Sequence, residues 1–416
     1  MLLETILNRC HKSKGFVYRT SRFSTRRGKT IIEIPVDSAK NRPGRCHRCL
    51  TEGPTYDHLP ERRFQFVPLW NYPVYLLYAP RRIDCPEHGP TVEAMPWASG
   101  KSPVCTVFRI FLAQWAKHLS WTQVARSFGV TWDTVRDAVS YVVAYGLAHR
   151  NLDSIKSIGV DEICYQAGKF LTLVYQLDAG GRRLLYVGDS RKAKTLLRFF
   201  FKLGPERCRG IAATCSDLWK PYLKVLKKKV PAALMVLDRF HIMQYLNDAI
   251  DTIRRQETHE LKRKGRAPLL ENSRWCILKN KENQTEKQLA RLSVLLRHNL
   301  KTTRGFLLKV ALLPFWESTT VAEADQFLSS WINRVMRSRL EPLKKVAKRF
   351  RRHKQLLLNW FLLTPRISNG ISEGFNLKAK LTMRKSYGFH HYRTIELALY
   401  HTLGNLPAPP LTHEFC

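Results

Sequence analysis

The order of short β-type runs and helical segments between residues 155 and 240 limits what this chain can fold into more than any other feature of its sequence. Three runs rich in β-branched and aromatic residues follow one another, and the connections between them carry glycine, which predicts an antiparallel meander. Two further strands come next, each preceded by a helix. The expected strands are 158–164, 170–177, 183–187, 211–215 and 232–237, and the expected helices are 193–203 and 218–228.

The helices between the later strands indicate how the strands pair. A helical crossover favours parallel pairing with a right-handed connection, so the first, fourth and fifth strands are expected to lie parallel. A long, basic, helical segment follows at 239–365, and 370–403 is again mostly helical, with an expected break at Gly388. The predicted fold class is therefore α/β. It is an RNase H-like mixed sheet in the order βββαβαβ, with an all-α insertion before the last helix.

The charge of the chain indicates its partner. The 416 residues include 70 Lys and Arg against 33 Asp and Glu, which gives a formal net charge of +37. The phosphates of nucleic acid attract such an excess and release counterions on binding. An anionic membrane surface is the alternative, but the positive charge is spread along the chain and not gathered on one amphipathic anchor. We therefore expect a nucleic acid partner.

The sequence also indicates a location. No apolar stretch approaches the roughly 18 residues of a membrane span, and the first residues lack the pattern of a secretory signal. The ten cysteines of a chain of this length without a signal do not suggest a disulfide scaffold. The expected location is the cytoplasm, with no membrane partner.

Two pairs of metal-binding residues, each with a gap of two residues, predict a zinc site. Such a gap allows both side chains of a pair to reach one ion, and two pairs complete a closed tetrahedral site. Zinc would fold a module too small to build its own core, and four protein ligands make the site structural. His47 and His58 are alternative ligands that fit the pairing less well. The predicted zinc ligands are Cys46, Cys49, Cys85 and His88.

The segment that follows resembles a helix-turn-helix. Ser120 and Gln123 match a capping box at the start of one helix, and Thr131 is suited to cap the next. That second helix would enter a major groove, although Asp133 and Asp137 on it would repel phosphates. An ordinary helical hairpin is the alternative. The predicted DNA contacts are Thr131, Trp132, Thr134 and Arg136.

Acidic residues suggest a catalytic site at one end of the predicted sheet. Asp161 falls inside the first strand and Asp217 just past the fourth, so parallel pairing brings both to one end. Two neighbouring carboxylates raise each other's pKa and need a cation, and a pair of Mg²⁺ (or Mn²⁺) ions suits chemistry at a phosphodiester. Glu373 is the best candidate for a third acid. On a helix it shares a face with Asn376 and Lys380.

Three other acids compete for these roles. Glu162 is a weak rival of the first acid because successive strand residues point to opposite faces. Asp189 ends the third strand, on the far side of the meander. Asp238, in Asp238-Arg-Phe-His241, competes with Asp217, which we prefer because the first and fourth strands should be immediate neighbours. Asp238 and His241 would then orient the scissile phosphate or a metal ligand.

Together these residues resemble the ISL-three family of bacterial insertion-sequence transposases. The most specific stretches are Val-Leu-Asp-Arg-Phe-His-Ile at 236–242, and Asn-Gly-Ile-Ser-Glu-Gly-Phe-Asn at 369–376 with Arg384 and residues 388–389. The resemblance implies a DDE-type catalytic domain with Asp161, Asp217 and Glu373 as its triad. Asp238 and His241 would match the Asp-x-x-His element of such families. Arg384 is expected to contact DNA.

The resemblance also implies an activity. The protein would bind terminal inverted repeats, cleave DNA with Mg²⁺ to free a 3′-hydroxyl, and join that hydroxyl to target DNA. A homodimer or larger complex is expected because two ends must be brought together, and the location would be the bacterial cytoplasm at the nucleoid. A nuclease or junction resolvase without strand transfer is one alternative, and a non-catalytic zinc and helix-turn-helix regulator is another. The expected domains are a basic segment with the zinc module (1–95), the helix-turn-helix (96–150), the catalytic core (151–238), the helical insertion (239–365) and the last part of the core with the third acid (366–416).

Overall fold

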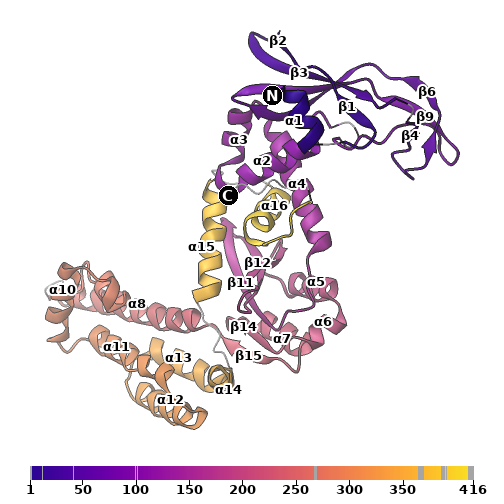
Figure 1. Cartoon of the computed structure of the whole chain (residues 1–416). Coiled ribbons are helices and arrows are strands. Elements are labelled where there is room, and N and C mark those ends of the chain that lie inside the picture. Colours follow the sequence, from indigo (N-terminus) through magenta and orange to yellow (C-terminus); the bar gives the residue numbers. More distant parts are fainter. Residues whose placement is uncertain are drawn as a thin grey trace. The chain divides into compact units, whose positions relative to one another are not determined.

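The chain forms two compact units, each with its own mixture of sheet and helix. The first unit consists of Met1–Arg150 and Ala379–Cys416, and the second of Asn151–Lys378. The boundary falls inside helix α15 (Gly370–Lys385), so the expected last part of the core, 366–416, divides between the units. The computed structural model, traced in Figure 1, describes residues 2–11, 13–40, 42–98, 100, 102–266, 269–363, 370–385, 389 and 391–410.

The described ranges bear on the expected helix break and on membrane spans. The expected break at Gly388 lies outside the described residues. Among the helices that are described, none combines the length and the apolar character needed to cross a membrane.

The first unit begins with a five-stranded sheet. Strand β3 pairs antiparallel with β1 and β2 and parallel with β8, and β7 pairs with β8. The side chains of Ile34, Phe64 and Leu76 are fully buried in its core. The bounds are α1 Leu3–Cys10, β1 Phe16–Tyr18, β2 Arg22–Arg26, β3 Lys29–Ser38, β7 Arg62–Leu69 and β8 Tyr72–Tyr78.

A smaller module in the same unit has almost no hydrophobic core. Its buried cluster consists of Ile83 and the two cysteines Cys46 and Cys85, with Cys49 packed against them. Strands β6, β9 and β10 form a three-stranded sheet, and β4 pairs with β5. A core of this size needs additional cross-linking to hold a fold. The bounds are β4 Gly44–Arg45, β5 Glu52–Gly53, β6 Thr55–His58, β9 Arg81–Cys85 and β10 Gly89–Val92.

The two helices of the expected helix-turn-helix begin at the caps that the sequence predicts. The Ser120 hydroxyl accepts the backbone N–H of Gln123, whose side chain accepts the N–H of Ser120 in return. Gly129 ends this helix at φ +62°, a conformation that glycine adopts without strain. The Thr131 hydroxyl caps the next helix by accepting the N–H of Thr134 at 3.1 Å. The bounds are α2 Thr106–His118, α3 Trp121–Phe128, α4 Trp132–His149 and α16 Tyr392–Leu403.

The second unit is built on a mixed five-stranded sheet in the order β13–β12–β11–β14–β15. Strands β11, β12 and β13 form the expected antiparallel meander, and β11, β14 and β15 are parallel as expected. Strand β14 ends opposite Val160, so Asp161 lies just beyond its end. The bounds are β11 Ser157–Gln166, β12 Lys169–Gln176, β13 Arg183–Gly188, β14 Ala213–Ser216 and β15 Leu234–Leu237.

Helices cover both faces of this sheet. On one face Val160 and Val174 pack with Phe199 of α5 and Leu226 of α7 in a hydrophobic cluster. On the other face α15 approaches so closely that a Cβ at Gly159 would lie 3.0 Å from the Ser372 hydroxyl. A side chain at this position would require the Ser372 hydroxyl or the neighbouring Leu177 side chain to shift. The bounds are α5 Ala193–Leu203, α6 Pro205–Arg209 and α7 Lys220–Lys229.

The segment between β15 and α15 is helical and has a hydrophobic core of its own, in which Trp331 and Phe350 are buried. Asn359 donates to the carbonyl oxygen of Met235 at 2.8 Å and so joins the end of the insertion to β15. The bounds are α8 Arg239–Arg263, α9 Arg274–Leu278, η1 Lys281–Asn283, α10 Glu286–Leu296, α11 Lys301–Val310, η2 Leu313–Glu317, α12 Val321–Met336, α13 Glu341–Arg352, α14 Lys354–Leu358 and η3 Asn359–Leu362.

Candidate functional site

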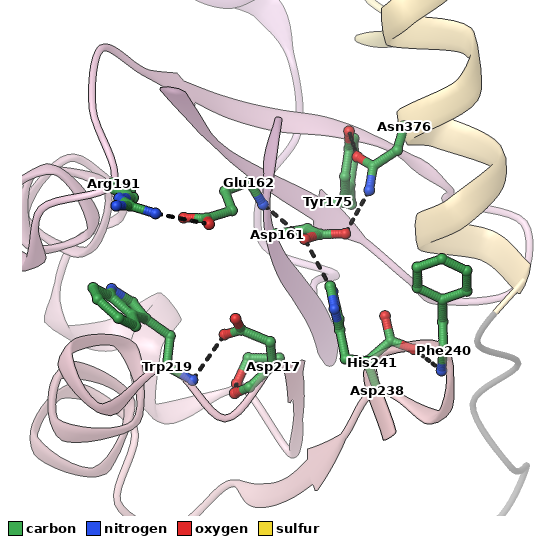
Figure 2. Close-up of polar contacts among 11 residues, drawn as sticks. Asp161, Glu162, Tyr175, Arg191, Asp217, Trp219, Asp238, Phe240, His241 and Asn376 are labelled. Carbon is green, nitrogen blue, oxygen red and sulfur yellow. Dashed lines mark hydrogen bonds and ion pairs between the residues drawn. The ribbon is translucent and has the colours of Figure 1, made fainter. Parts of the chain in front are cut away.

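Asp161 lies in the central strand β11, on the face of the sheet that α15 covers (Figure 2). It is buried, and its Oδ1 accepts the N–H of Glu162 at 2.7 Å and lies 3.4 Å from Nε2 of His241. Its Oδ2 accepts a hydrogen bond from the side-chain amide of Asn376. The Tyr175 hydroxyl donates to Oδ1 of Asn376 at 2.9 Å. The amide therefore has a fixed orientation, with its oxygen toward Tyr175 and its nitrogen toward Asp161.

Asp238 and His241 lie at the start of α8, directly after β15. Asp238 is the N-cap of this helix, and its Oδ1 accepts the N–H of Phe240 at 2.9 Å. One turn later His241 faces Asp161 (Figure 2). Ligand atoms of Asp161, Asp238 and His241 all lie within 4.8 Å of one another, close enough to hold one metal ion. The structure therefore brings the predicted Asp-x-x-His element next to the first predicted acid.

Asp217 follows β14, as predicted, and is partly buried. Its Oδ1 accepts the N–H of Trp219 at 3.0 Å. Burial raises the pKa of Asp217, and the charge of Asp161 raises it further, against the Trp219 hydrogen bond and His241. Asp217 is not a member of the close cluster found among the described residues, although β14 is the immediate neighbour of β11. Strand order alone did not indicate that Asp238 lies in this cluster.

The cluster places the basic side chain of His241 among buried carboxyl groups, and this arrangement shifts the pKa values of both kinds of group. Burial raises the pKa of Asp238 to about 6, and the charges of Asp161 and Glu373 contribute to the rise. Burial disfavours the charged form of His241, but the hydrogen bond and charge of Asp161, with the charges of Asp238 and Asp217, outweigh it and raise the pKa of His241 to about 9. Without a metal ion on its ring nitrogen, His241 is therefore an imidazolium at neutral pH and supplies positive charge among the acids.

Glu373 is exposed in the first turn of α15. Its charge contributes to the raised pKa of Asp238, but among the described residues Glu373 is not a member of the close cluster. Asn376 lies one turn later and is engaged with Asp161, whereas Lys380 and Arg384 are exposed on later turns. The face predicted from the sequence thus carries an acid, an amide and a cation along α15, and Arg384 follows one turn after Lys380.

The rival acids point elsewhere. Glu162 points to the opposite face of β11, where it pairs with Arg191 at 3.6 Å. Burial raises the pKa of Glu162, the charge of Asp217 adds to the rise, and Arg191 opposes it. Oε2 of Glu162 is buried and has no hydrogen-bond partner among the described residues. Asp189 pairs with Arg198 at 3.6 Å, away from the cluster.

Two residues of the site were missed by the sequence analysis. Tyr175 is fully buried and orients Asn376, and its ring stacks on Phe375 of α15 with centroids 4.8 Å apart. Arg191 forms an ion pair with Glu162 and so offsets its negative charge. The only available signal for Tyr175 was its pairing with Gly159 across the meander, which places it on the same face as Asp161.

The acids fit a divalent cation. Burial raises the pKa of Asp217 and Asp238, and the charge of Asp161 adds to both rises. Buried carboxylates of this kind are stabilised by a cation that accepts oxygen ligands, such as Mg²⁺ or Mn²⁺.

The four predicted zinc ligands also come together. The sulfur atoms of Cys49 and Cys85 lie 3.5 Å apart, and Nδ1 of His88 lies 3.8 Å from the sulfur of Cys46 and 3.6 Å from that of Cys85. Tetrahedral zinc with Zn–S of about 2.3 Å and Zn–N of about 2.0 Å requires separations close to these. Hydrogen bonds from backbone N–H groups lower the pKa of Cys46, which favours the thiolate that binds metal. The residues therefore fit zinc.

The alternative ligands take no part in this cluster. Nδ1 of His47 lies 3.1 Å from the carbonyl oxygen of Val92 and 3.2 Å from the hydroxyl of Thr91. His58 ends β6 and is not among the grouped ligands of the described residues.

The predicted recognition helix, α4, carries its own counter-charges. The Arg136 guanidinium lies 2.9 Å from Asp133 and 3.0 Å from Asp137. It also lies near the ring of Trp132, with 5.9 Å to the centroid. Thr131 and Trp132 are exposed at the start of the helix, while Thr134 is partly buried. Arg136 therefore offsets the repulsion that its two acidic neighbours would exert on phosphates.

Known proteins with similar sequences are transposases. A sequence model of a family described as a transposase, of the DDE class and ISL3 group, matches residues 158–399, more than half of the chain. The chain is 29% identical over 398 residues to the transposase for insertion sequence element IS1557 in two strains of Mycobacterium tuberculosis, with 89% of this chain and 88% of the relative covered. It is 26% identical over 350 residues to the transposase for insertion sequence element IS1001 of Bordetella parapertussis, with 83% and 85% covered. The family match contains all the acids of the cluster.

Proposed function

This chain belongs to the ISL3 family of DDE transposases, and from that membership we propose that it binds the terminal inverted repeats of an insertion sequence, cleaves the phosphodiester at each end and joins the freed 3′ end to target DNA. A transposase of the DDE class acts on DNA and uses divalent metal ions. The observation that carries the proposal is the cluster of Asp161, Asp238 and His241, which lies beside the middle of β11, where β14 and β15 end. The strand order also supports an RNase H-like core, with an all-α insertion between β15 and α15.

The proposed catalytic triad is Asp161, Asp217 and Glu373, which would hold two Mg²⁺ or Mn²⁺ ions. When bound, these ions would activate the attacking oxygen and stabilise the leaving oxygen at the phosphodiester. Asp238 is the rival for the second position, and its proximity to Asp161 supports it. His241 would orient the Asp161 carboxylate through its hydrogen bond and add positive charge beside a scissile phosphate.

Several residues of the chain would position the reactants without touching the reacting atoms. Asn376 holds one oxygen of Asp161 in place, so the other oxygen is directed toward His241. Lys380 and Arg384 are exposed cations that would attract phosphates of bound DNA. The proposed reaction proceeds by in-line displacement in both steps and needs no covalent link between protein and DNA.

The N-terminal region would supply specific DNA binding. Structural Zn²⁺, held by three cysteines and a histidine, would fix the module within residues 1–95, and the helix-turn-helix within 96–150 would read the repeat. We propose contacts from α4 and a homodimer or larger assembly, because two ends must be held together. The proposed contacts on α4 are Thr131, Trp132, Thr134 and Arg136.

The test is single-turnover cleavage of a labelled terminal repeat in Mg²⁺ by full-length variants. Asp161→Ala and Glu373→Ala should abolish cleavage while binding to the repeat, measured by gel shift, persists. Asp217→Ala and Asp238→Ala identify the second acid, because the ligand variant should lose cleavage completely. The matched control is Asp189→Ala, which removes an acid paired with Arg198 outside the cluster and should cleave normally.

The outcomes separate the proposal from its alternatives. Full cleavage by the Asp161→Ala protein would contradict the metal site. A strand-transfer assay with precleaved ends distinguishes a transposase from a nuclease that only hydrolyses, because a nuclease would leave these ends unjoined.

A further inference from the structure

Two hairpin turns lie together at one end of the five-stranded sheet of the first unit. The first connects β2 to β3 at Arg27 and Gly28, and the second connects β7 to β8 at Trp70 and Asn71. Strands β3 and β8 run parallel, with Ile32 opposite Val74. Each turn directly precedes its strand, so the two turns are neighbours at the same end of the sheet. We call this region, residues 22–30 and 69–73, the hairpin tip.

The hairpin tip exposes large aromatic side chains. Trp70 is 85% exposed and Phe23 is 71% exposed, and Tyr72 is exposed as well. The rings of Phe23 and Tyr72 meet edge to face with centroids 5.8 Å apart, beside Trp70 in the register of the sheet. Exposed apolar groups gathered in this way mark interaction sites more often than scattered surface residues do.

The backbone conformation at Trp70 is a second and independent indication that the hairpin tip is an interaction site. Its φ is +47° and that of Asn71 is +69°. A two-residue hairpin turn with both residues at positive φ favours Asn-Gly, and a bulky residue there is strained by about 1–3 kcal/mol. Because the indole is exposed, packing within the unit does not explain why tryptophan occupies this position. Strain of this kind at an exposed side chain points to a function of the side chain itself.

The hairpin tip itself contains cations and no acid, and its nearest acid along the chain is the buried Glu33 of β3. Residues 19–32 contain five cations and no acid, and residues 62–83 also contain no acid. Arg22 pairs with Glu33, whereas Arg26 lies over the ring of Tyr75 at 5.5 Å. Within the described residues no ion pair is found for Arg26, Arg27 or Lys29. Cations that no acid neutralises, interleaved with exposed aromatic rings, match the phosphates and bases of DNA.

We propose that the hairpin tip is a second DNA contact, separate from α4, in which Trp70 inserts between or stacks upon bases of duplex DNA while Arg26, Arg27 and Lys29 hold the flanking phosphates. A two-stranded ribbon fits a DNA groove, and apolar side chains at its end unstack base steps and bend the duplex. This proposal rests on the proposed function of the chain as a DNA transposase. It adds to that function a surface that deforms the DNA at the terminal repeat. Duplex DNA is chosen over a membrane because the cations lie along strands of a sheet and not on an amphipathic helix.

The decisive variant is Trp70→Gly in the full-length protein. Glycine accepts positive φ, so the melting temperature should stay the same or rise, which separates binding from folding. Affinity for a duplex terminal repeat, measured by fluorescence anisotropy, should fall about 5- to 150-fold, the loss expected for one stacked base. The matched control is Phe201→Ala, which removes an aromatic side chain that is 87% exposed on α5 and should leave affinity unchanged.

A base analogue tests the insertion itself. A terminal repeat with 2-aminopurine at successive positions should brighten at one step when the wild-type protein binds, because unstacking relieves quenching, and Trp70→Gly should leave that step dark. Arg27→Ala should reduce the salt dependence of binding by about one phosphate contact. Unchanged affinity and unchanged 2-aminopurine signal in Trp70→Gly would overturn the proposal. Failure of the wild-type protein to bind any terminal repeat would instead contradict the proposed function.

Discussion

Replacing Asn376 by alanine tests whether α15 is held to the sheet through the first acid. The side-chain amide accepts from the Tyr175 hydroxyl at 2.9 Å and donates to Asp161. Burial raises the pKa of Tyr175 well above its usual value, so the hydroxyl stays protonated and needs an acceptor. Asn376→Ala leaves this buried donor unpaired, at a cost of about 1–3 kcal/mol, and removes a charge-assisted bond of about 1.5–3 kcal/mol. We expect the free energy of unfolding to fall by about 3 kcal/mol.

The same substitution should slow the chemistry. Glu373 lies one turn before Asn376 on α15, so a loosened helix displaces the third proposed acid together with the oriented carboxylate of Asp161. Losing a partner that orients a metal ligand costs about 10–100-fold in metal affinity or activity. The assays are thermal melting of the full chain and single-turnover end cleavage. A unit of this size should lose about 2–4 °C of melting temperature per kcal/mol. Leu377→Ala, on the exposed side of the same helix, is the matched control and should change neither measurement.

A double-mutant cycle with Tyr175 tests whether the hydrogen bonds from Tyr175 to Asn376 and from Asn376 to Asp161 are the cause of these losses. Tyr175→Phe removes the donor, so Asn376→Ala in that background no longer strands a hydroxyl and should cost about 1 kcal/mol less than in the wild type. Strict additivity of the two substitutions, or a melting temperature and cleavage rate of Asn376→Ala equal to those of the wild type, would refute this reasoning.

Three further predictions concern metal, pH and DNA. His88→Ala, or treatment with a strong chelator, should unfold the module that contains β9 and weaken end binding, which circular dichroism and anisotropy measure; unchanged spectra would contradict a structural zinc. Burial lowers the pKa of Lys309 to about 8, below its usual 10.5, so the unfolded state binds more protons between these values. Stability relative to Lys309→Met should therefore rise by about 3 kcal/mol from pH 8 to 10.5 in urea titrations, and a flat difference would rule out the shift. Arg136→Ala leaves Asp133 and Asp137 uncompensated on α4 and should lower end affinity with little loss of stability, since exposed ion pairs contribute about 0–1 kcal/mol.

The sheet of the second unit could be predicted because each of its signals is local. β-branched runs with glycine between them indicate antiparallel neighbours, and a helix between strands indicates a parallel pair. The helix caps at Ser120 and Thr131 depend only on residues three positions apart, and the structure has both. The opposite directions of Asp161 and Glu162 follow from strand alternation in the same way.

The composition of the acid cluster depends on interactions that are not local. Strand order placed Asp217 nearest to the first acid, yet Asp238 and His241 form the close group with Asp161. The reason is the direction in which α8 leaves β15, which the hydrophobic pattern of a helix does not specify. The contact between Tyr175 and Asn376 joins residues 201 positions apart and has no signature in either segment.

The helical insertion between β15 and α15 is connected to the proposed site at both of its ends. A long helical segment can therefore interrupt the core without separating the proposed site residues. The chain leaves the sheet through α8, whose first turn carries Asp238 and His241, and returns through α15, which carries Glu373. Strand β15 is the last strand of the sheet, and an uncovered edge invites pairing with other chains. Asn359 bonds the backbone of this strand from the end of the insertion.

Within the insertion, Lys309 donates to two carbonyl oxygens near the end of α9, at 2.9 and 3.2 Å, and to Asn247 of α8 at 3.2 Å. This buried cation therefore fixes α8 against its neighbours two turns beyond His241. A substitution that loosens the insertion should consequently shift His241 and slow end cleavage, even when the substituted residue contacts none of the acids. Lys309→Met should therefore slow end cleavage as well as alter the pH dependence of stability, and a variant with an altered pH dependence but a wild-type cleavage rate would show that the insertion and the site are mechanically independent.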